Sequence, residues 1–413
     1  MNRGNIVVGL EVGTTKVCVV VAELRADETI NVIGIGQAPS CGVRKGEIVD
    51  FDHAIQCIKR AVADAEESAG IEIRSVYAGV TGGHIRSVTN RGMVPITNED
   101  REISADDIEA VMRNAKAIDI PVENAVVHSM RQHFHIDGQD GVLNPVGMLG
   151  SRLEADVLVV HGVRNRLQNT IRCIKTVGLE VEDVVVSGIA SALAVLTREQ
   201  KEMGALVIDM GGGTTDFAVY TDGVIKHAGI LAVGGDHISN DLHLGLKIPL
   251  SRAEKLKCEQ GSCLIDDMAR GQTVNLPGEI GMPERTVLKE SLQQVIHLRV
   301  KEVFEIIARA VERQRLTNFI GGGVFLTGGG SHLADIGKLA EETFGLPVHL
   351  RPTATVAGLT KALDKPEFAT AIGLTMYGLA SQRKPVATHQ KIRPAEIMKN
   401  LKGLFARVRM FFW

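Results

Sequence analysis

The sequence predicts a protein of two or more domains with a duplicated architecture. Two observations predict this fold class. The chain has 413 residues, which is too long for a single hydrophobic core. Apolar, strand-like runs at Ile6–Leu10 and Ala205–Ile208 each lead into a glycine-rich loop of the same plan, and another apolar run follows each loop.

Composition sets the broad class. Hydrophobic residues make up 45% of the chain and charged residues 23%, as in an ordinary globular protein. The net charge of −3 gives no reason to expect a nucleic-acid partner. No CxxC pair is present, so zinc is not expected. The run Asn5–Leu10 already reads as a strand rather than a signal peptide, so we expect a cytoplasmic protein with buried thiols. Its six cysteines are Cys18, Cys41, Cys57, Cys173, Cys258 and Cys263.

The two matching loops predict a phosphate site. Each has an acidic residue at the end of a strand, one spacer, glycine, paired threonines and a returning strand, Val17–Ala22 or Phe217–Tyr220. Glycine lets backbone N–H groups approach an anion, and threonine hydroxyls add donors. The acidic residues Glu11 and Asp209 can hold Mg²⁺ directly or through its waters. One such hairpin alone would indicate only a turn. The loop residues are Glu11, Gly13, Thr14, Thr15, Lys16, Asp209, Gly211, Gly212, Gly213, Thr214 and Thr215.

A third glycine loop predicts a place for a ring or a ribose. Val324–Thr327 reads as a strand, Gly328, Gly329 and Gly330 as a turn, and Ser331 as the N-cap of a helix. Taken alone, it could equally be a plain strand-to-helix connection. Neither a dinucleotide-binding GxGxxG nor a GxxxxGK[ST] P-loop occurs at these positions.

The C-terminal segment Ala395–Trp413 predicts an amphipathic helix that lies flat on a membrane. Four cations and the lack of a long apolar run exclude a spanning helix. A terminal helix packed on the protein's own core is the alternative. The apolar face would hold Ile397, Leu401, Leu404, Phe405, Val408, Phe411 and Phe412, closed by Trp413, and the polar face Lys399, Lys402, Arg407 and Arg409.

In this order the three loops resemble the nucleotide-binding elements of the actin, Hsp70 and sugar-kinase superfamily. The resemblance implies an α/β, actin-like two-domain ATPase fold, with ATP and Mg²⁺ in the cleft between the domains. It implies a nucleoside-binding helix at Ala253–Gly261 and a connecting helix at Phe368–Leu374, where small residues permit close approach. Without the resemblance, Glu254 and Lys257 on this helix could simply be a solvated pair. The further nucleotide-binding residues implied are Gly234, Gly235, Asp236, Glu254 and Lys257.

One branch fits more closely. Ile136–Gly141 with Asn144–Ala155, and Tyr77–Ile85, resemble the signatures of the FtsA family of bacterial division proteins. The resemblance implies an FtsA-type inserted subdomain at 84–162. It divides the rest into a first core (1–83, 163–197, 366–383), a second core (198–232, 316–365), a nucleoside- and partner-binding subdomain (233–315), a linker (384–394) and the tail helix (395–413).

What this family implies is a membrane tether. Such a protein binds ATP and forms an actin-like polymer with itself on the cytoplasmic face of the membrane at the division site. It grips the C-terminal peptide of FtsZ and helps to recruit later division proteins. The helix around Ser291–Phe304 resembles the family's peptide-docking helix, with Arg299 and Glu302 as contacts; the alternative is an amphipathic surface helix.

Two departures qualify the resemblance. Glu11 stands where much of the superfamily has Asp, so slow ATP hydrolysis at most is expected, and no catalytic base is named. The linker from Ser381 to Gln390 looks short for the family. The rival classes are an actin-like rod-shape or pilus-assembly ATPase and, with less support, a small-molecule kinase. An Hsp70-type chaperone would need a peptide-binding domain after the ATPase unit.

Overall fold

The computed structural model describes residues 6–25, 29–266, 270–276, 278, 284–350, 357–358 and 365–382. Its first half is built on a six-stranded sheet with the strand order β11-β6-β1-β2-β3-β19. The first hairpin forms as predicted, since β1 pairs antiparallel with β2. The strands are β1 (Ile6–Val12), β2 (Lys16–Leu24), β3 (Ile30–Pro39), β6 (Ser75–Val80), β11 (Glu180–Val186) and β19 (Ala357–Gly358).

The second half repeats this plan. A five-stranded sheet has the order β14-β13-β12-β17-β18, and β12 pairs antiparallel with β13 as the second hairpin. Its central strands are buried on both faces: Leu206 and Ile208 pack into one hydrophobic cluster, and Val207 packs into another. The strands are β12 (Ala205–Met210), β13 (Thr215–Thr221), β14 (Val224–Leu231), β17 (Val324–Thr327) and β18 (Val348–Leu350).

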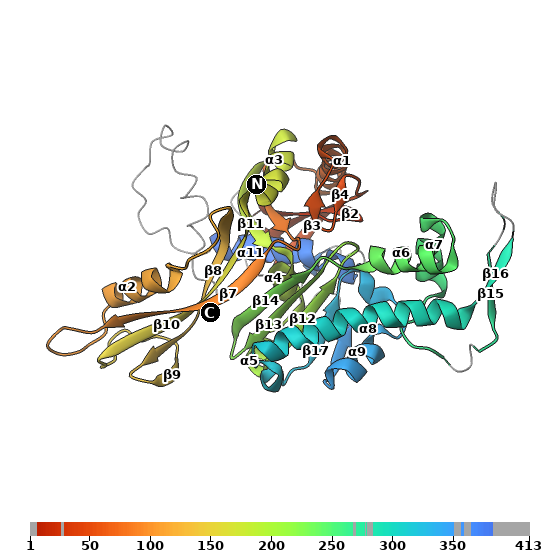
Figure 1. The fold of residues 1–413 in the computed structure, drawn as a ribbon. Coiled ribbons are helices and arrows are strands. Elements are labelled where there is room, and N and C mark those ends of the chain that lie inside the picture. The colour runs from red at the N-terminus through yellow and green to blue at the C-terminus, as the bar shows by residue number, and fades with distance from the viewer. Residues whose placement is uncertain are drawn as a thin grey trace.

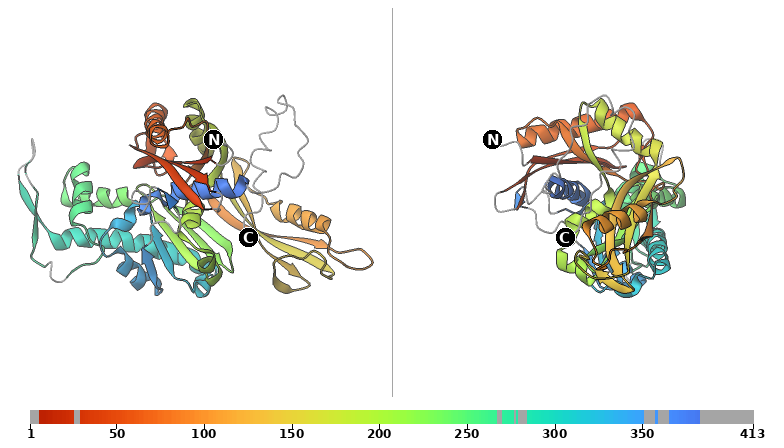
Figure 2. Two further views of the ribbon diagram at one scale, coloured as in Figure 1. Left: turned by 180° about the vertical axis from the view of Figure 1, so that it is seen from behind. Right: turned by 90° about the vertical axis from the view of Figure 1, so that its left-hand side faces the viewer.

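Two helices, α4 (Ser187–Val195) and α11 (Ala369–Gln382), lie between the two sheets, as Figure 1 and the side view of Figure 2 show. Both are rich in small residues. A Cβ atom placed on Gly373 would lie 1.8 Å from the backbone oxygen of Ala190, so only glycine allows this contact. The prediction that small residues permit close approach in this helix is confirmed.

Other helices cover the outer faces. On the first sheet these are α1 (Phe51–Ala69), which begins at the N-cap Asp50, and α3 (Arg164–Thr176). On the second half, α6 (Gly235–Leu246), α7 (Leu250–Gln260), α8 (Lys289–Arg313) and α9 (Ile336–Phe344) share one hydrophobic cluster with the sheet. Two short hairpins, β4–β5 (Val43–Arg44, Glu47–Ile48) and β15–β16 (Thr273–Leu276, Arg285–Leu288), and the helix α5 (Arg198–Met203) complete the two halves.

An inserted subdomain projects from the first half (Figure 1). Its four-stranded antiparallel sheet has the order β7-β10-β8-β9, and α2 packs against it. A capping box starts α2: the amide of Asp107 donates to Ser104 Oγ, and the amide of Ser104 donates to the Asp107 carboxylate. A separate hydrophobic cluster forms its core. The elements are β7 (Arg86–Pro95), α2 (Ala105–Lys116), β8 (Asn124–Ile136), β9 (Gln139–Val142) and β10 (Arg152–Val163).

The prediction of buried thiols is only partly confirmed. Cys18, Cys173 and Cys263 are buried, but Cys41 and Cys258 are exposed and Cys57 is partly exposed. The sequence pattern misleads here because Cys41 lies in a loop and Cys258 on the cavity side of α7. Across the described helices, none is both long enough and apolar enough to cross a membrane.

Candidate functional site

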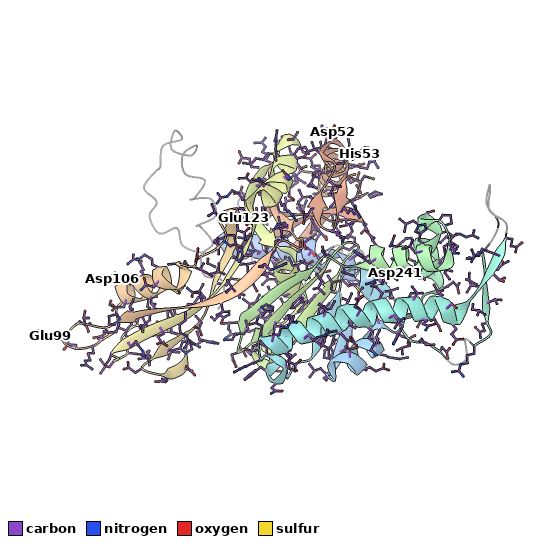
Figure 3. The ribbon with its side chains drawn as sticks, in the orientation of Figure 1. Asp52, His53, Glu99, Asp106, Glu123 and Asp241 are labelled. Carbon is purple, nitrogen blue, oxygen red and sulfur yellow. The ribbon has the colours of Figure 1, made fainter. Side chains whose placement is uncertain are left out.

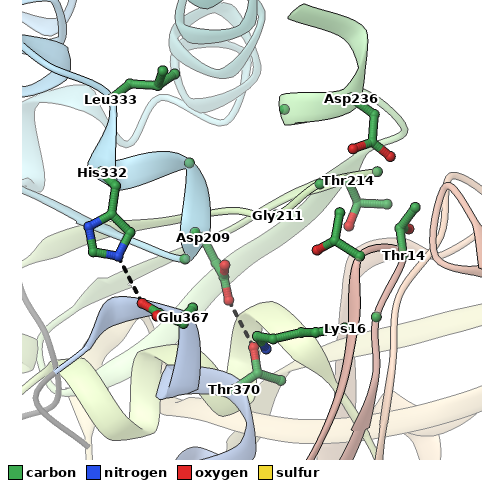
Figure 4. A pocket seen from close by; sticks show the side chains of 18 of the residues that line it. Thr14, Lys16, Asp209, Gly211, Thr214, Asp236, His332, Leu333, Glu367 and Thr370 are labelled. Carbon is green, nitrogen blue, oxygen red and sulfur yellow. Dashed lines mark hydrogen bonds and ion pairs between the residues drawn. The ribbon is translucent and has the colours of Figure 1, made fainter. Parts of the chain in front are cut away.

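A cavity of about 450 Å³ opens between the two halves. Both glycine-rich hairpins and the third glycine loop line it, as predicted (Figure 4). Most of the predicted residues meet there although they come from distant parts of the chain. The predicted residues on its wall are Glu11, Gly13, Thr14, Thr15, Lys16, Asp209, Gly211, Gly212, Gly213, Thr214, Gly235, Asp236, Glu254, Lys257, Gly328, Gly329 and Gly330.

The first hairpin carries an ion pair. Its turn closes with a 2.9 Å hydrogen bond from the amide of Gly13 to the carbonyl of Lys16. Lys16 Nζ then donates to Glu11 Oε2 at 2.7 Å. Burial favours the neutral amine, but the neighbouring Glu11 carboxylate outweighs it, so the pKa of Lys16 is raised above its ordinary value. The hairpin therefore presents a held cation to the cavity.

The second hairpin closes in the same way and faces the first. The amide of Gly211 donates to the carbonyl of Thr214 at 2.9 Å. A Cβ atom on Gly212 would lie 2.3 Å from Thr15 Cγ2, and one on Gly213 would lie 2.3 Å from Thr14 Oγ1. Glycine at both positions lets the two loops meet face to face, with backbone N–H groups and hydroxyls around one small volume.

Asp209 is anchored to both helices between the sheets. Ser191 of α4 donates to its Oδ2, and Thr370 of α11 donates to the same oxygen at 2.9 Å (Figure 4). Burial raises the pKa of Asp209, and these two hydroxyls oppose that rise. Asp209 thus joins the second hairpin to the helices at the base of the cleft.

Asp216 is a second buried carboxylate on the cavity wall. It pairs with Asp209 across β12 and β13. Thr81 Oγ1 lies 2.9 Å and 2.8 Å from its two oxygens. Burial and the Asp209 charge raise the pKa of Asp216 to about 7, although the Thr81 hydroxyl stabilises its charged form.

The N-terminus of α6 is hydrogen-bonded to the second hairpin. The amides of Gly235 and Asp236 donate to the carbonyls of Gly211 and Gly212 at 2.9 and 2.8 Å. The prediction that Gly234 belongs to the wall is not met, since Gly234 does not line the cavity. A Cβ there would lie 2.5 Å from the Gly211 carbonyl oxygen, so the close approach of these two segments needs glycine. Gly234 therefore shapes the junction rather than the wall.

The predicted pair on α7 forms. Lys257 Nζ lies 2.7 Å from Glu254 Oε2, and it also donates to Ser239 Oγ and to the carbonyl of Gly235 at 3.0 and 3.1 Å. Burial opposes the charge of Glu254, but hydrogen bonds from Lys257 and Ser239 outweigh it and lower its pKa. The ammonium of Lys257 is buried in the wall, whereas 49% of the Glu254 side chain is exposed. The pair is therefore anchored by hydrogen bonds on the lysine side, unlike the fully solvated pair that was the alternative.

The third loop differs from its prediction in one respect. Gly328 has a φ of 81°, which favours glycine. The next residues form a short 3-10 helix, Gly329–His332, rather than the start of an α-helix. Ser331 is therefore not an N-cap: its hydroxyl donates back to the Gly328 carbonyl at 2.7 Å, and α9 begins only after Asp335. The side chains of Ser331 and Thr215 are buried outside the cavity wall, where Thr215 donates to the Val233 carbonyl.

Several wall residues were missed by the sequence analysis. His332 Nε2 lies 2.8 Å from Glu367 Oε2, so a pair from the third loop and the segment before α11 stands at the cavity (Figure 4). Several of them lie inside segments already named from the sequence but were not singled out there: Val12 and Asp216 in the hairpins, Cys258, Glu259 and Gly261 in Ala253–Gly261, Thr81 in Tyr77–Ile85 and Thr370 in Phe368–Leu374. The missed residues are Val12, Thr81, Ser187, Asp216, Cys258, Glu259, Gly261, His332, Leu333, Ala334, Glu367 and Thr370.

Arg299 and Glu302 lie on α8, outside the cavity wall. Arg299 Nε lies 2.5 Å from Asp241 Oδ2 and its Nη2 lies 3.1 Å from Oδ1, so Asp241 holds it at two points. Figure 3 shows the position of Asp241 on α6. Glu302, one turn along α8, also pairs with Arg299. The guanidinium is thus held in a fixed position with 28% of its side chain exposed.

The predicted membrane helix lies outside the described residues. This applies to Ile397, Lys399, Leu401, Lys402, Leu404, Phe405, Arg407, Val408, Arg409, Phe411, Phe412 and Trp413.

The duplicated sheets, the helices between them and the cleft lined by paired hairpins define an actin-like two-domain fold. Solved structures agree on the fold. The PilM–PilN type IV pilus biogenesis complex superposes with a TM-score of 0.65 at 18% identity, covering 92% of this chain and 99% of that chain. MreB5 of Spiroplasma citri bound to ADP superposes with a TM-score of 0.54 at 16% identity, covering 92% and 98%.

Sequence comparison gives the family. A family model described as "Cell division protein FtsA" matches residues 206–373, and one described as "SHS2 domain inserted in FTSA" matches residues 82–161. The cell division protein FtsA of Pseudomonas aeruginosa is 39% identical over 382 residues, 92% of this chain and 91% of its own length. That of Borreliella burgdorferi is 35% identical and that of Escherichia coli K12 is 32% identical, each over 98% of both chains. The chain belongs to the FtsA family of cell division proteins.

Proposed function

We propose that the cavity binds ATP with Mg²⁺, with the phosphates between the two hairpins and the adenosine near Gly328–Gly330 and α7. The observation that carries this proposal is the facing of two hairpins of one design across a single volume. Two loops of backbone amides, two pairs of threonines and the held ammonium of Lys16 suit a chain of phosphates. MreB5 of Spiroplasma citri, which shares this fold, is described bound to ADP and to AMPPNP, which supports a nucleotide as the ligand.

The residues present fit Mg²⁺ as part of such a complex. Lys16 occupies Oε2 of Glu11, and two hydroxyls occupy Oδ2 of Asp209. Oε1 of Glu11 and Oδ1 of Asp209 have no hydrogen-bond partner within the described residues. Among those residues, no group of three or more acidic, histidine or cysteine side chains could hold a metal alone. Mg²⁺ prefers to keep waters and take phosphate oxygens, so the two carboxylates would orient it through water while it neutralises phosphate charge.

We propose further that this protein polymerises under the cytoplasmic membrane, anchors FtsZ there and helps to recruit later division proteins. Membership of the FtsA family supports this role. Arg299 suits an acidic peptide, because a guanidinium pairs well with carboxylates. Asp241 and Glu302 already pair with it, so a peptide carboxylate would share or displace one of these partners. The amphipathic sequence of 395–413 would supply the membrane contact.

Two measurements test the proposal. Calorimetric titration of the full chain with ATP and Mg²⁺ should give one site per chain. Sedimentation with anionic vesicles should carry an FtsZ C-terminal peptide into the pellet only when the protein is present. Absence of ATP binding would overturn the assignment of the cavity, while peptide left in the supernatant would overturn the tether.

A further inference from the structure

Thr81 stands where three parts of the molecule meet. It follows β6 of the first half and directly precedes the segment 82–161 that matches the inserted domain. Its hydroxyl reaches the second half, with Asp216 at 2.8–2.9 Å and Thr214 Oγ1 at 3.4 Å. It also lines the cavity, at the end where we propose that the phosphates bind. The root of the inserted subdomain is therefore bonded to a strand of the second hairpin.

The inserted subdomain makes further bonds to the second half. Ser87 Oγ donates to the carbonyl of Ala228 at 2.6 Å, and Gln132 Nε2 donates to the carbonyl of Ile225 at 3.1 Å. Both carbonyls belong to β14, the edge strand of the second sheet. We call these contacts and the Thr81–Asp216 bond the seam.

The seam has a direct connection to the cavity. Strand β13 carries Asp216 at its start and pairs along its length with β14, where Asp216 faces Ile230 and Ala218 faces Ala228. A shift of Asp216 would therefore be passed to β14 through the ladder of β13. Packed strands transmit such a shift because their interiors have little free space.

The Thr81 hydroxyl has a single proton to donate. In this structure the buried carboxylate of Asp216 is positioned to receive it, and that carboxylate is 3% exposed. The terminal phosphate of a nucleoside triphosphate would bring competing anionic oxygens to the same end of the cavity, and a diphosphate would not. Thr214 Oγ1, at 3.4 Å, is too distant to compete with either anionic acceptor. One donor and two anionic acceptors therefore give two discrete arrangements.

We propose that Thr81 is a positioning residue whose hydroxyl donates either to Asp216 or to a terminal phosphate, so that a bound triphosphate loosens the inserted subdomain from the second half. This inference rests on the proposed nucleotide site. The inserted subdomain would then be held more loosely to the second half with a triphosphate bound than with a diphosphate bound.

Hydrogen–deuterium exchange of the full chain tests this, with Mg²⁺ and either ADP or a non-hydrolysable ATP analogue. Peptides covering 86–90 and 225–230 should exchange at least about fivefold faster with the analogue, the low end of typical couplings between sites. Thr81→Ser should keep this difference, since it keeps the hydroxyl. Thr81→Val should abolish it, with fast exchange in both states.

Ser87→Ala is the matched control at the other end of the seam. It should speed exchange in both states, leave nucleotide affinity unchanged and keep the difference between the two nucleotides. Equal exchange in the wild type with both nucleotides bound, or a difference that survives in Thr81→Val, would overturn the inference while sparing the nucleotide site. If calorimetry finds that neither nucleotide binds, the proposed function fails and this inference fails with it.

Discussion

Lys16 donates a 2.7 Å hydrogen bond to Glu11 at the base of the first hairpin, and only 15% and 19% of the two side chains are exposed. The cation therefore already neutralises the carboxylate that the family resemblance places beside Mg²⁺. Glu11 is also one methylene longer than the aspartate of many relatives in the superfamily. Both features weaken the hold of this residue on a metal and its waters.

We accordingly expect slow ATP hydrolysis, with a steady-state turnover below about 1 s⁻¹, near the lower end of typical enzymes. Phosphate release in the presence of Mg²⁺ measures it, and the Asp209→Asn variant gives the background. A faster turnover would show that the carboxylates and hydroxyls of the cavity position water better than this pairing suggests.

Gly212→Asp should weaken ATP binding by at least about a hundredfold, since both sterics and charge oppose it. A Cβ at this position would lie 2.3 Å from Thr15 Cγ2 and 3.2 Å from Asp236 Oδ1. The new carboxylate would also repel the phosphates in a closed cleft, where a like charge at about 4 Å costs several kcal/mol at an effective dielectric of about 20. Gly245→Asp, at an exposed position of α6 with Val295 3.9 Å away, is the control. Equal ATP affinity in the two variants would refute the placement of the phosphates.

Arg299→Glu should abolish binding of the acidic FtsZ peptide and leave ATP binding intact. The change reverses the charge beside Asp241 and Glu302, so the site would repel a further carboxylate. Arg309→Glu is a matched control on the same helix, because it also breaks an ion pair, with Glu305 at 3.2 Å. Fluorescence anisotropy of a labelled peptide distinguishes the two variants. Retained affinity in Arg299→Glu would move the contact elsewhere.

His128 should make the folded state sensitive to acid. Burial lowers the pKa of His128 to about 4, from 6.5, and its Nε2 accepts a hydrogen bond from the Val186 amide at 3.1 Å. Between these two pKa values the unfolded chain binds a proton that the folded chain does not. Stability is therefore lost as the pH falls from about 6.5 to about 4, by roughly 3 kcal/mol from this group.

The His128→Gln variant isolates this contribution, since glutamine offers an acceptor and does not titrate. Urea unfolding at several pH values should show a shallower pH dependence in the variant, by up to one proton. Parallel curves for the two proteins would mean that the ring does not remain neutral in the fold.

Deletion of 392–413 should abolish sedimentation with anionic vesicles and leave the melting temperature nearly unchanged. If the tail instead packed on the protein's own core, each lost phenylalanine would cost about 3–5 kcal/mol, and the melting temperature would fall. Phe405→Glu should be as severe as the deletion. Binding should also weaken on neutral lipid and at high salt, because each cation near an anionic surface contributes about 1 kcal/mol. A truncated chain that still sediments would contradict the prediction.

The hairpins could be predicted because their signal is local. Each has its acidic residue, glycines, threonines and strands within one short segment, and β1 pairs with β2 and β12 with β13 accordingly. The family resemblance added Glu254 and Lys257, which lie on the cavity wall. The N-cap at Ser331 was wrong because a strand, glycines and a serine also fit a 3-10 turn, which leaves the helix to start later.

The long-range contacts of the remaining wall residues could not be predicted, because the partners are distant in the chain. Thr81 meets Asp216 across 135 positions, and Asp209 meets Thr370 across 161. The ion pair between Arg299 and Asp241 could not be predicted for the same reason, since Asp241 lies 58 positions away on another helix. Such pairs depend on how the two sheets and their helices pack, and no periodicity along one segment carries that information.

The missing side chain at Gly373 also limits how the molecule can change shape. Its backbone in α11 touches the backbone of α4 with no side chain between them. The two helices therefore have no free space into which they could slide at this point. We therefore expect relative motion there to take the form of one helix rolling on the other. The displacement caused by a rotation grows with distance from its axis. A small roll at Ala190, at the base of the cleft, would therefore produce a large displacement at the far end of the inserted subdomain.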